Sequence, residues 1–177
     1  IYDRLVGSEM CIRDRWYSCH SCHQDGGTNS RPMDTFNDGT PLTNKTVLSL
    51  YDVTRTGPWT WHGWQKNLTD AMHKSLTTTM LGKAPDPKEV TSLLAYLETL
   101  KIPPNPHRLP DGSLSASAKR GKQVFASSKA ACINCHNGDH FTDGRIHDVG
   151  LGSKSDKYQG YNTPSLRGLY RKVRFLH

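Results

Sequence analysis

The chain has 177 residues, of which 34% are hydrophobic and 8% are aromatic, and its formal net charge is +7. This length and composition allow one or two small domains with a thin apolar core, so we expect a large apolar cofactor or a metal to help organise the chain. No apolar run in the sequence is long enough to span a bilayer, which excludes an ordinary transmembrane helix.

The first fifteen residues differ from the rest of the chain. They contain no capping signal ahead of an apolar periodicity, and the string VGSEMCIRDR resembles a translated sequencing-library adaptor. We therefore interpret residues 1–15 as a non-native segment and assign no role to Cys11. The other end, RKVRFLH, stops in mid-pattern without a helix terminator. We expect the chain to be a fragment at both ends.

A Cys-x-x-Cys-His motif occurs near the start and recurs far downstream. The two copies are Cys19, Cys22 and His23, and Cys132, Cys135 and His136. This spacing is typical of a metal-binding knuckle, a dithiol redox pair or the attachment site of a c-type haem. A zinc ribbon keeps its two knuckles roughly 15 to 20 residues apart, whereas about 110 residues separate these two. A thioredoxin-like pair needs a βαβ pattern, which is absent here, and leaves the histidines unexplained.

Covalent haem gives the histidine a role in both copies. The two cysteines would form thioethers with the porphyrin vinyl groups, and the adjacent histidine would ligate the iron. We therefore predict two c-type haems, with His23 and His136 as the proximal ligands, and keep zinc or accidental pairing as the alternative. Two haems would add four propionates and lower the formal net charge from +7 to about +3. We attribute the basic composition to solubility and propionate pairing and expect no nucleic-acid partner.

The clearest secondary-structure signal lies between the two motifs. Asp86 suits an N-cap, Pro87 the first helical turn and Glu89 the reciprocal capping position. Apolar residues then recur at helical spacing, namely Val90, Leu93, Leu94, Leu97 and Leu100. Two prolines end the pattern at positions 103 and 104. The pattern predicts an amphipathic helix over residues 87–100.

A proline-rich stretch and a second helical pattern follow. The four prolines of IPPNPHRLPDGSLS predict an extended linker, and SASAKRGKQVFASSKAAC predicts a helix that leads into the second motif. Strand signals are weak throughout. We therefore predict a mainly α fold with two cytochrome c-like domains, each around a covalently attached haem. The first domain covers residues 16–102, the linker 103–114, and the second domain 115–177, with its C-terminus incomplete.

Several short motifs surround the second Cys-x-x-Cys-His. Gly121 and Phe125 precede it, and Thr142–Asp143, the HDVG segment at 147–150 and the TPSLRG segment at 163–168 follow it. With these motifs the chain resembles the bacterial di-haem cytochrome c peroxidases and the related MauG proteins over roughly residues 16–177. The resemblance implies a di-haem c-type cytochrome oxidoreductase that passes electrons between two covalent haems and reduces hydrogen peroxide.

The first half contains one agreement with that family and one departure from it. In TWHGWQKNL, Trp61 lies where these peroxidases have a tryptophan between their haems, so it is the candidate inter-haem conduit; simple packing against porphyrin is the alternative. Where the family has a glutamate that activates peroxide, followed by a methionine, this chain has Thr79 and Met80. A threonine hydroxyl is unsuited to moving a proton between the peroxide oxygens. The alternative function is therefore electron transfer without peroxidase activity.

Other side chains are candidates for the surroundings of the haems. Met80 precedes the capped helix, the order in which small c-type cytochromes place a methionine loop, so we predict it as the sixth ligand of the first haem. His62 and His73 are the alternatives for that ligand. Arg167 is a candidate partner for a propionate, because a guanidinium suits a carboxylate. Asn44 is a candidate ligand, through its carbonyl, for the calcium ion that related enzymes often hold.

The resemblance also bears on partners and location. It implies a redox protein donor such as a small cytochrome or a cupredoxin, hydrogen peroxide as the oxidant, and a homodimer. We expect the sixth ligand of the second haem beyond His177. Because the thioether bonds of c-type haem form outside the cytoplasmic membrane, we expect a periplasmic protein whose signal sequence is missing from this fragment.

Overall fold

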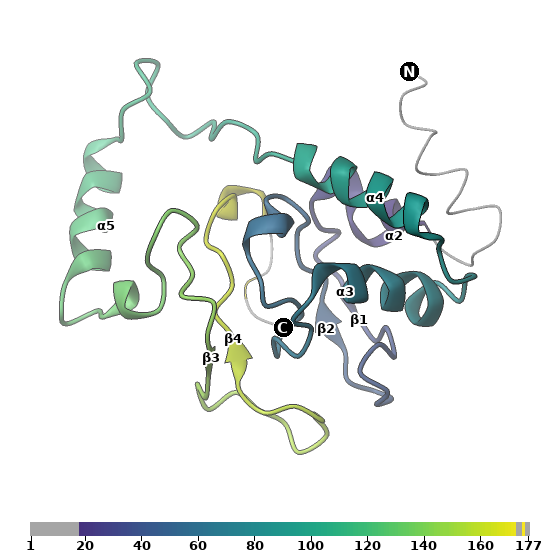
Figure 1. Ribbon diagram of the computed structural model, residues 1–177. Helices are drawn as coiled ribbons and strands as arrows, with labels where there is room; N and C mark the ends of the chain where they lie inside the picture. Colours follow the sequence, from purple (N-terminus) through teal and green to yellow (C-terminus); the bar gives the residue numbers. More distant parts are fainter. Residues whose placement is uncertain (1–17, 173–174, 176–177) are drawn as a thin grey trace.

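The structure is a computed structural model that describes residues 18–172 and 175. The predicted adaptor-derived segment at 1–15 lies outside these residues. Among the described residues, three α-helices precede the proline-rich stretch, namely α2 (Cys19–Cys22), α3 (Leu68–Lys74) and α4 (Pro87–Thr99), and α5 (Ala116–Ala126) follows it. In Figure 1, α3 and α4 lie close together with α2 behind α4, whereas α5 stands at the opposite side of the molecule at the end of an extended connection.

The predicted capped helix is confirmed as α4. The Asp86 carboxylate accepts hydrogen bonds from the amides of Lys88 (2.7 Å) and Glu89 (2.9 Å), and the Glu89 carboxylate accepts one from the Asp86 amide (2.9 Å). This reciprocal pair satisfies amides that an uncapped helix would leave without partners. On the predicted apolar face, Val90 and Leu97 are buried, at 5% and 2% exposure. The sequence pattern thus placed both the start and the inner face of α4 correctly.

A turn of π-helix extends α3 toward the chain reversal before α4. α3 begins at Asn67, whose side chain accepts hydrogen bonds from the amides of Thr69 (2.8 Å) and Asp70 (3.3 Å). The π-helical turn, Ser75–Thr79, follows directly, and Met80 ends it by donating its amide to the carbonyl of Ser75 (3.0 Å). π-Helical turns are rare and often mark functional sites.

The apolar core lies mostly in the first half. Six of the buried hydrophobic side chains precede the linker: Val53, Ala71, Leu76, Met80, Val90 and Leu97. After the linker, Tyr161 is the one such side chain among the described residues. α5 begins at Ser115, whose hydroxyl accepts a hydrogen bond from the amide of Ala118 (3.2 Å), and it buries none of its side chains. The second half therefore has little apolar packing of its own.

The strands are short and form two antiparallel pairs. β1 (Pro32–Met33) pairs with β2 (Lys45–Thr46), and β3 (Ile146–His147) pairs with β4 (Tyr161–Asn162). Short 3-10 turns complete the structure, at Gln24–Gly26, Val53–Arg55, Cys132–Asn134 and Leu169–Arg171. Among the described residues, no helix is long and apolar enough to cross a membrane.

The two halves meet where the loop after Pro58 contacts β4. The Asn162 amide donates to the carbonyl of Trp61 (2.8 Å), and the Asn162 side chain donates to the carbonyl of Pro58 (2.6 Å). Gly63 has φ +58°, and a Cβ there would lie 3.0 Å from Pro58 and 3.2 Å from the Cβ of Asn162. Only glycine fits this close approach without strain. The chain therefore brings segments about one hundred residues apart into direct contact.

Candidate haem-attachment sites

The first Cys-x-x-Cys-His motif forms one turn of helix. α2 places Cys19 and Cys22 one turn apart, and the amide of His23 donates to the carbonyl of Cys19 (2.8 Å). Both cysteines are half-buried and neither is in a disulfide. Burial raises the pKa of the Cys22 thiol. The turn thus presents two thiols and an imidazole within five residues.

The second motif folds in the same way. The 3-10 turn Cys132–Asn134 begins after Ala131, which has φ +55°, and the amide of His136 donates to the carbonyl of Cys132 (2.9 Å). Cys132 and Cys135 are also half-buried and unpaired with each other. The same amide-to-carbonyl contact, from the histidine to the first cysteine, therefore closes both motifs.

The imidazole rings of the two motif histidines are oriented by the backbone. Nδ1 of His136 lies 3.0 Å from the carbonyl oxygen of Phe141, which it can donate to, leaving Nε2 for a metal. Nδ1 of His23 is buried and has no hydrogen bond of ordinary geometry in the described part of the chain. Burial lowers the pKa of His23, and the carbonyls of Gly27 and Leu48 act against that shift. A lowered pKa favours the neutral imidazole, which is the form that ligates iron.

The surroundings of the second motif fit a large apolar cofactor. Apolar side chains in this half are exposed by more than two-fifths: Val124 (61%), Ile133 (44%), Phe141 (44%), Ile146 (42%), Val149 (55%) and Leu151 (45%). Soluble proteins rarely leave many large apolar side chains exposed in one region without a function for them. A porphyrin linked to Cys132 and Cys135 would cover apolar surface of this kind, and the residues present therefore fit a haem.

A second metal-ligand arrangement includes one motif cysteine. One ligand atom each of Cys135, Asp143 and His147 lie within 4.8 Å of one another. Structural zinc takes four ligands, and this group has three. His147 Nε2 already contacts the Asp143 carboxylate at 2.7 Å. Zinc here would leave Cys132 and His136 without a role, so the arrangement favours haem over the zinc alternative.

Met80 and Thr79 lie at the end of the π-helical turn. Met80 is 6% exposed and packs in the core of the first half; its ligation of the first iron stays a prediction. The Thr79 hydroxyl accepts a hydrogen bond from the Asn37 side chain (2.9 Å) and donates a weaker one to the carbonyl of Thr35 (3.4 Å). These two contacts tie the Thr79 hydroxyl to the loop at residues 35–37.

Trp61, the candidate conduit, lies at the junction of the two halves. Its indole nitrogen donates to the carbonyl of Thr46 in the first half (2.6 Å), and its own carbonyl accepts from the amide of Asn162 in the second (2.8 Å). The ring is half-buried. Contacts to both halves are what an inter-haem residue requires, and its conduit role stays a prediction.

Arg167 forms an ion pair that the sequence did not indicate. Its guanidinium lies 3.0 Å from the carboxylate of Asp52, a side chain that is only 4% exposed. Arg167 also lines a cavity of about 130 Å³, together with Arg171 and Lys172; the cavity lies between residues 24–28 and 49–51 of the first half and residues 167–172 of the second. Burial lowers the pKa of Lys172. Arg167 therefore holds the halves together, and its pairing with a propionate stays a prediction.

Of the remaining candidates, His62 has the most informative environment. It is 5% exposed, and its Nδ1 lies 2.6 Å from the carbonyl of Gly160. Its Nε2 is buried, 3.7 Å from the Asp156 carboxylate. His73 is half-buried in α3 and Asn44 is exposed before β2, and the calcium suggested for Asn44 stays a prediction. His62 thus belongs to a polar cluster between the halves.

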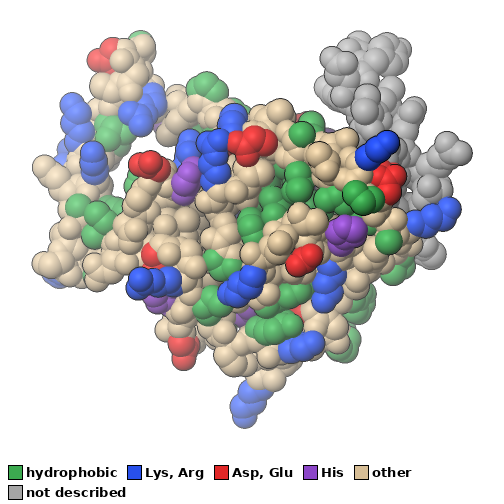
Figure 2. All heavy atoms as spheres, in the orientation of Figure 1, with side chains coloured by type: hydrophobic (Ala, Val, Ile, Leu, Met, Phe, Trp, Pro, Cys, Tyr) green, Lys and Arg blue, Asp and Glu red, His purple; other side chains and the backbone are tan. Residues whose placement is uncertain are grey.

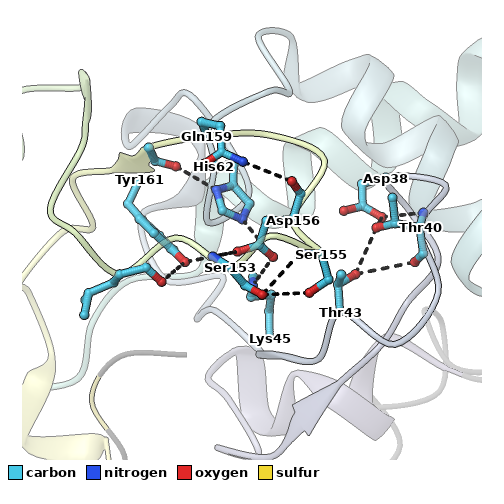
Figure 3. A network of polar contacts seen from close by, with 12 residues as sticks. Asp38, Thr40, Thr43, Lys45, His62, Ser153, Ser155, Asp156, Gln159 and Tyr161 are labelled. Atoms are coloured by element: carbon cyan, nitrogen blue, oxygen red, sulfur yellow. Dashed lines mark hydrogen bonds and ion pairs between the residues drawn. The ribbon is translucent and has the colours of Figure 1, made fainter.

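This cluster is centred on Asp156, as Figure 3 shows. The Lys45 ammonium donates to the Asp156 carboxylate at 2.6 Å, and the Ser153 amide donates to it at 3.0 Å. The Tyr161 hydroxyl lies 3.4 Å from the same carboxylate. Burial first, and then the charge of Asp156, raise the pKa of Tyr161 to about 12. Sequence reasoning missed this cluster because its members come from segments far apart in the chain.

The chain has partial similarity to two curated proteins. It is 38% identical over 72 residues to hydrazine synthase subunit gamma of Kuenenia stuttgartiensis, a match that covers 37% of this chain and 20% of that protein. It is 48% identical over 54 residues to methylamine utilization protein MauG of Methylophilus methylotrophus, covering 30% of this chain and 16% of that protein. The chain spans about a fifth or less of the length of these relatives. No protein-family model matches it.

A solved structure resembles the chain over most of its length. Hydrazine synthase of Kuenenia stuttgartiensis, pressurised with xenon, superposes with a TM-score of 0.74 over 91% of this chain and 68% of that chain, at 21% identity. At this identity the likeness concerns the fold alone. Together with the two motifs, the sequence similarities support a cytochrome c-like protein with haem and a redox function, and they do not single out the MauG-like branch.

Proposed function

We propose that the protein is a c-type cytochrome that carries two covalent haems and passes electrons between them. The observation that carries this proposal is the shared geometry of the motifs: in each, the histidine amide donates to the carbonyl of the first cysteine, at 2.8 and 2.9 Å. One such turn could be accidental. Two that match in sequence and in backbone contact are best explained by a common cofactor.

The residues around each motif have distinct tasks in this proposal. The cysteine thiols form the thioethers, and the motif histidines ligate iron through Nε2, with Nδ1 of His136 held by the Phe141 carbonyl. The haems, when bound, supply one-electron chemistry. Trp61 lies between the halves, so its ring shortens the path that an electron has to cross through the protein.

We further propose that electron transfer is the principal role. Peroxide reduction, which the family resemblance implies, is the alternative. Peroxide cleavage needs a group that moves a proton between the two oxygens. The Thr79 hydroxyl is held by Asn37 and Thr35 and is a poor proton-transfer group. This supports electron transfer without peroxide reduction. Peroxide-dependent oxidation of a reduced donor by the holoprotein would establish the enzyme instead.

The haem content of cysteine variants tests the proposal. Replacing Cys132 and Cys135 together with alanine should halve the covalent haem, measured by mass spectrometry of the denatured chain and by pyridine haemochrome absorbance. Replacing Cys19 and Cys22 should do the same, whereas the matched control Cys11→Ala should leave the content unchanged. Haem content that stays at its original value in the Cys132/Cys135 variant would overturn the assignment for that motif.

The proposal extends to location and partners. Because c-type haem is attached outside the cytoplasmic membrane, we propose a periplasmic protein. The relative named hydrazine synthase subunit gamma is, by that name, one subunit of an assembly, which supports a protein partner. A small cytochrome or cupredoxin is the donor we propose, and a homodimer is an expectation that size-exclusion chromatography with light scattering would test.

A further inference from the structure

Two loops from the two halves run side by side and pair their rings. The imidazole of His62 packs on the ring of Tyr161 with centroids 4.7 Å apart. Two residues further along the first loop, Trp64 stacks on Tyr158, with centroids 5.4 Å apart and an angle of 13° between the planes. Residues 61–64 and 158–162 therefore form two layers of rings at the junction of the halves.

The two ring pairs differ in depth. His62 and Tyr161 are buried, at 5% and 7% exposure, whereas Trp64 and Tyr158 are each half-buried. The first pair lies inside the molecule, and His62 directly follows Trp61 in the chain. The second pair reaches the surface, and its member Trp64 is three residues after Trp61 in the chain. The half-buried outer pair is therefore close in sequence to Trp61, the residue that we propose as the inter-haem conduit.

Lysine ammonium groups lie over both rings of the outer pair. Nζ of Lys74, at the end of α3, is 4.6 Å from the centroid of Trp64, and Nζ of Lys157 is 5.5 Å from that of Tyr158. Cation–π contacts of this kind hold a charge in place without neutralising it. We define the outer stack as Lys74, Trp64, Tyr158 and Lys157.

The charges of the outer stack lack a carboxylate partner. Neither ammonium forms an ion pair within the described ranges, 18–172 and 175; Lys157 donates only to the backbone carbonyl of Asp38 (2.9 Å). Figure 2 shows Lys or Arg side chains at the tip of the loop between β3 and β4, the lowest part of the molecule in that view. This loop contains Lys154 and Lys157. The acidic residue closest in sequence on α3 is Asp70, one turn before Lys74.

The buried cluster keeps this loop in place. Asp156 points inward to Lys45 (2.6 Å), as Figure 3 shows, and the Gln159 side chain donates to the Asp156 carbonyl (3.1 Å). Lys157, which is exposed, and Tyr158, which is half-buried, lie between these anchored positions. The outer stack is therefore preorganised, which lowers the entropy that a partner would lose on docking.

We propose that the outer stack is the docking surface for an acidic redox protein and the place where its electron enters. This inference rests on the proposed electron-transfer function. Carboxylates around the donor's metal centre would meet the two ammonium groups, and the exposed ring edges would meet its apolar contact. With haem bound, the step would be a one-electron transfer in which the donor's metal centre is oxidised and one haem held by the motif residues is reduced.

The other basic region fits such a donor less well. Arg167 is already paired with Asp52 at 3.0 Å, and Lys172 and Arg171 line a cavity of about 130 Å³, which suits a small anion better than a protein surface. Arg171 lies over Tyr51, with its guanidinium carbon 5.5 Å from the ring centroid. Among the described residues, Tyr51 belongs to no aromatic ring pair. The variant Arg171→Glu therefore tests the alternative that the donor docks at this other basic region.

The test measures reduction of the oxidised holoprotein by a reduced acidic [2Fe–2S] ferredoxin in stopped flow, as a function of salt. The double variant Lys74→Glu/Lys157→Glu should lower the second-order rate at low salt by tenfold or more, because steering by charge typically changes such rates by about 10 to 10³. The difference should vanish at high salt, where the Debye length is short. The glutamine double variant, which keeps the stems over the rings, should give an intermediate rate.

Matched variants separate the parts of the inference. Lys83→Glu/Lys88→Glu makes the same charge change at two exposed lysines near the start of α4 and should leave the rate near that of the wild type. Trp64→Leu should lower the limiting rate at saturating ferredoxin and keep the salt dependence. An equal loss in the α4 control, or a loss that follows Arg171→Glu instead, would overturn the inference. Absence of covalent haem, or of reduction by dithionite, would overturn the proposed function instead.

Discussion

The substitution Asp156→Asn tests whether the buried cluster holds the two halves together. Asparagine keeps the shape of the side chain and removes its charge. The Asp156 side chain is 2% exposed, and the Lys45 side chain that donates to it at 2.6 Å is 19% exposed. The variant therefore leaves an ammonium group without its counter-charge in a place that water reaches poorly.

The expected cost follows from those exposures. Removing one partner of a fully buried ion pair destabilises a protein by about 3–5 kcal/mol. Because Lys45 keeps some contact with solvent, we expect the lower end, about 3 kcal/mol. For a chain of this size, each kcal/mol lowers Tm by about 2–4 °C, so the midpoint should fall by roughly 6–12 °C.

Urea unfolding followed by tryptophan fluorescence measures this loss, and four tryptophans in the chain provide the signal. Asp111→Asn, at an exposed carboxylate, is the matched control and should leave both the urea concentration at the unfolding midpoint and the Tm unchanged. Lys45→Met and the double variant complete a cycle, in which the second substitution should cost much less than the first. A loss below about 1 kcal/mol, or additive costs in the cycle, would refute the reasoning.

Two further predictions concern the haem environment. Met80→Leu keeps the core volume, so its stability cost should stay below about 1.5 kcal/mol. If Met80 ligates iron, the variant should bind carbon monoxide and have a lower reduction potential. An unchanged ferric spectrum would instead assign Met80 to the core. Burial acts to raise the pKa of Asp143, but hydrogen bonds from the Arg145 amide, His147 and Thr163 lower it to about 2. An unfolded aspartate titrates near 3.9, so the stability from this depressed pKa is complete above about pH 4 and is lost as the pH falls toward 2. Because the His147 side chain is 35% exposed and solvent screens its charge, the effect is at most about 1 kcal/mol. Asp143→Asn should flatten the dependence of the unfolding free energy on pH over that window.

Local signals were readable from the sequence where neighbouring residues decide the structure. The capping box at Asp86 and Glu89 and the inner face of α4 depend only on spacing within one helix, and the structure confirms them. The predicted helix before the second motif is confirmed as α5. In each case the physical cause acts over a few residues.

Contacts between distant segments could not be predicted from the sequence. Lys45 and Asp156 are 111 residues apart, and His62 and Gly160 are 98 apart. A lone aspartate in a loop of serines and lysines has no periodicity or spacing that indicates burial. Arg167 illustrates the same limit, because its guanidinium chemistry indicated an anionic partner but could not indicate Asp52. The tertiary fold determines which distant residue becomes the partner of each of these side chains.

The contact between the loop after Pro58 and β4 also affects the order in which the chain can fold. When only residues 16–102 are available to fold, Lys45 and His62 still lack Asp156 and Gly160, to which they later bind. Contacts over such sequence distances slow folding, because the chain has to close a long loop before the contacts can stabilise it. We therefore expect the first half to remain incompletely packed, with its motif cysteines accessible, until the segment at 156–162 is also present.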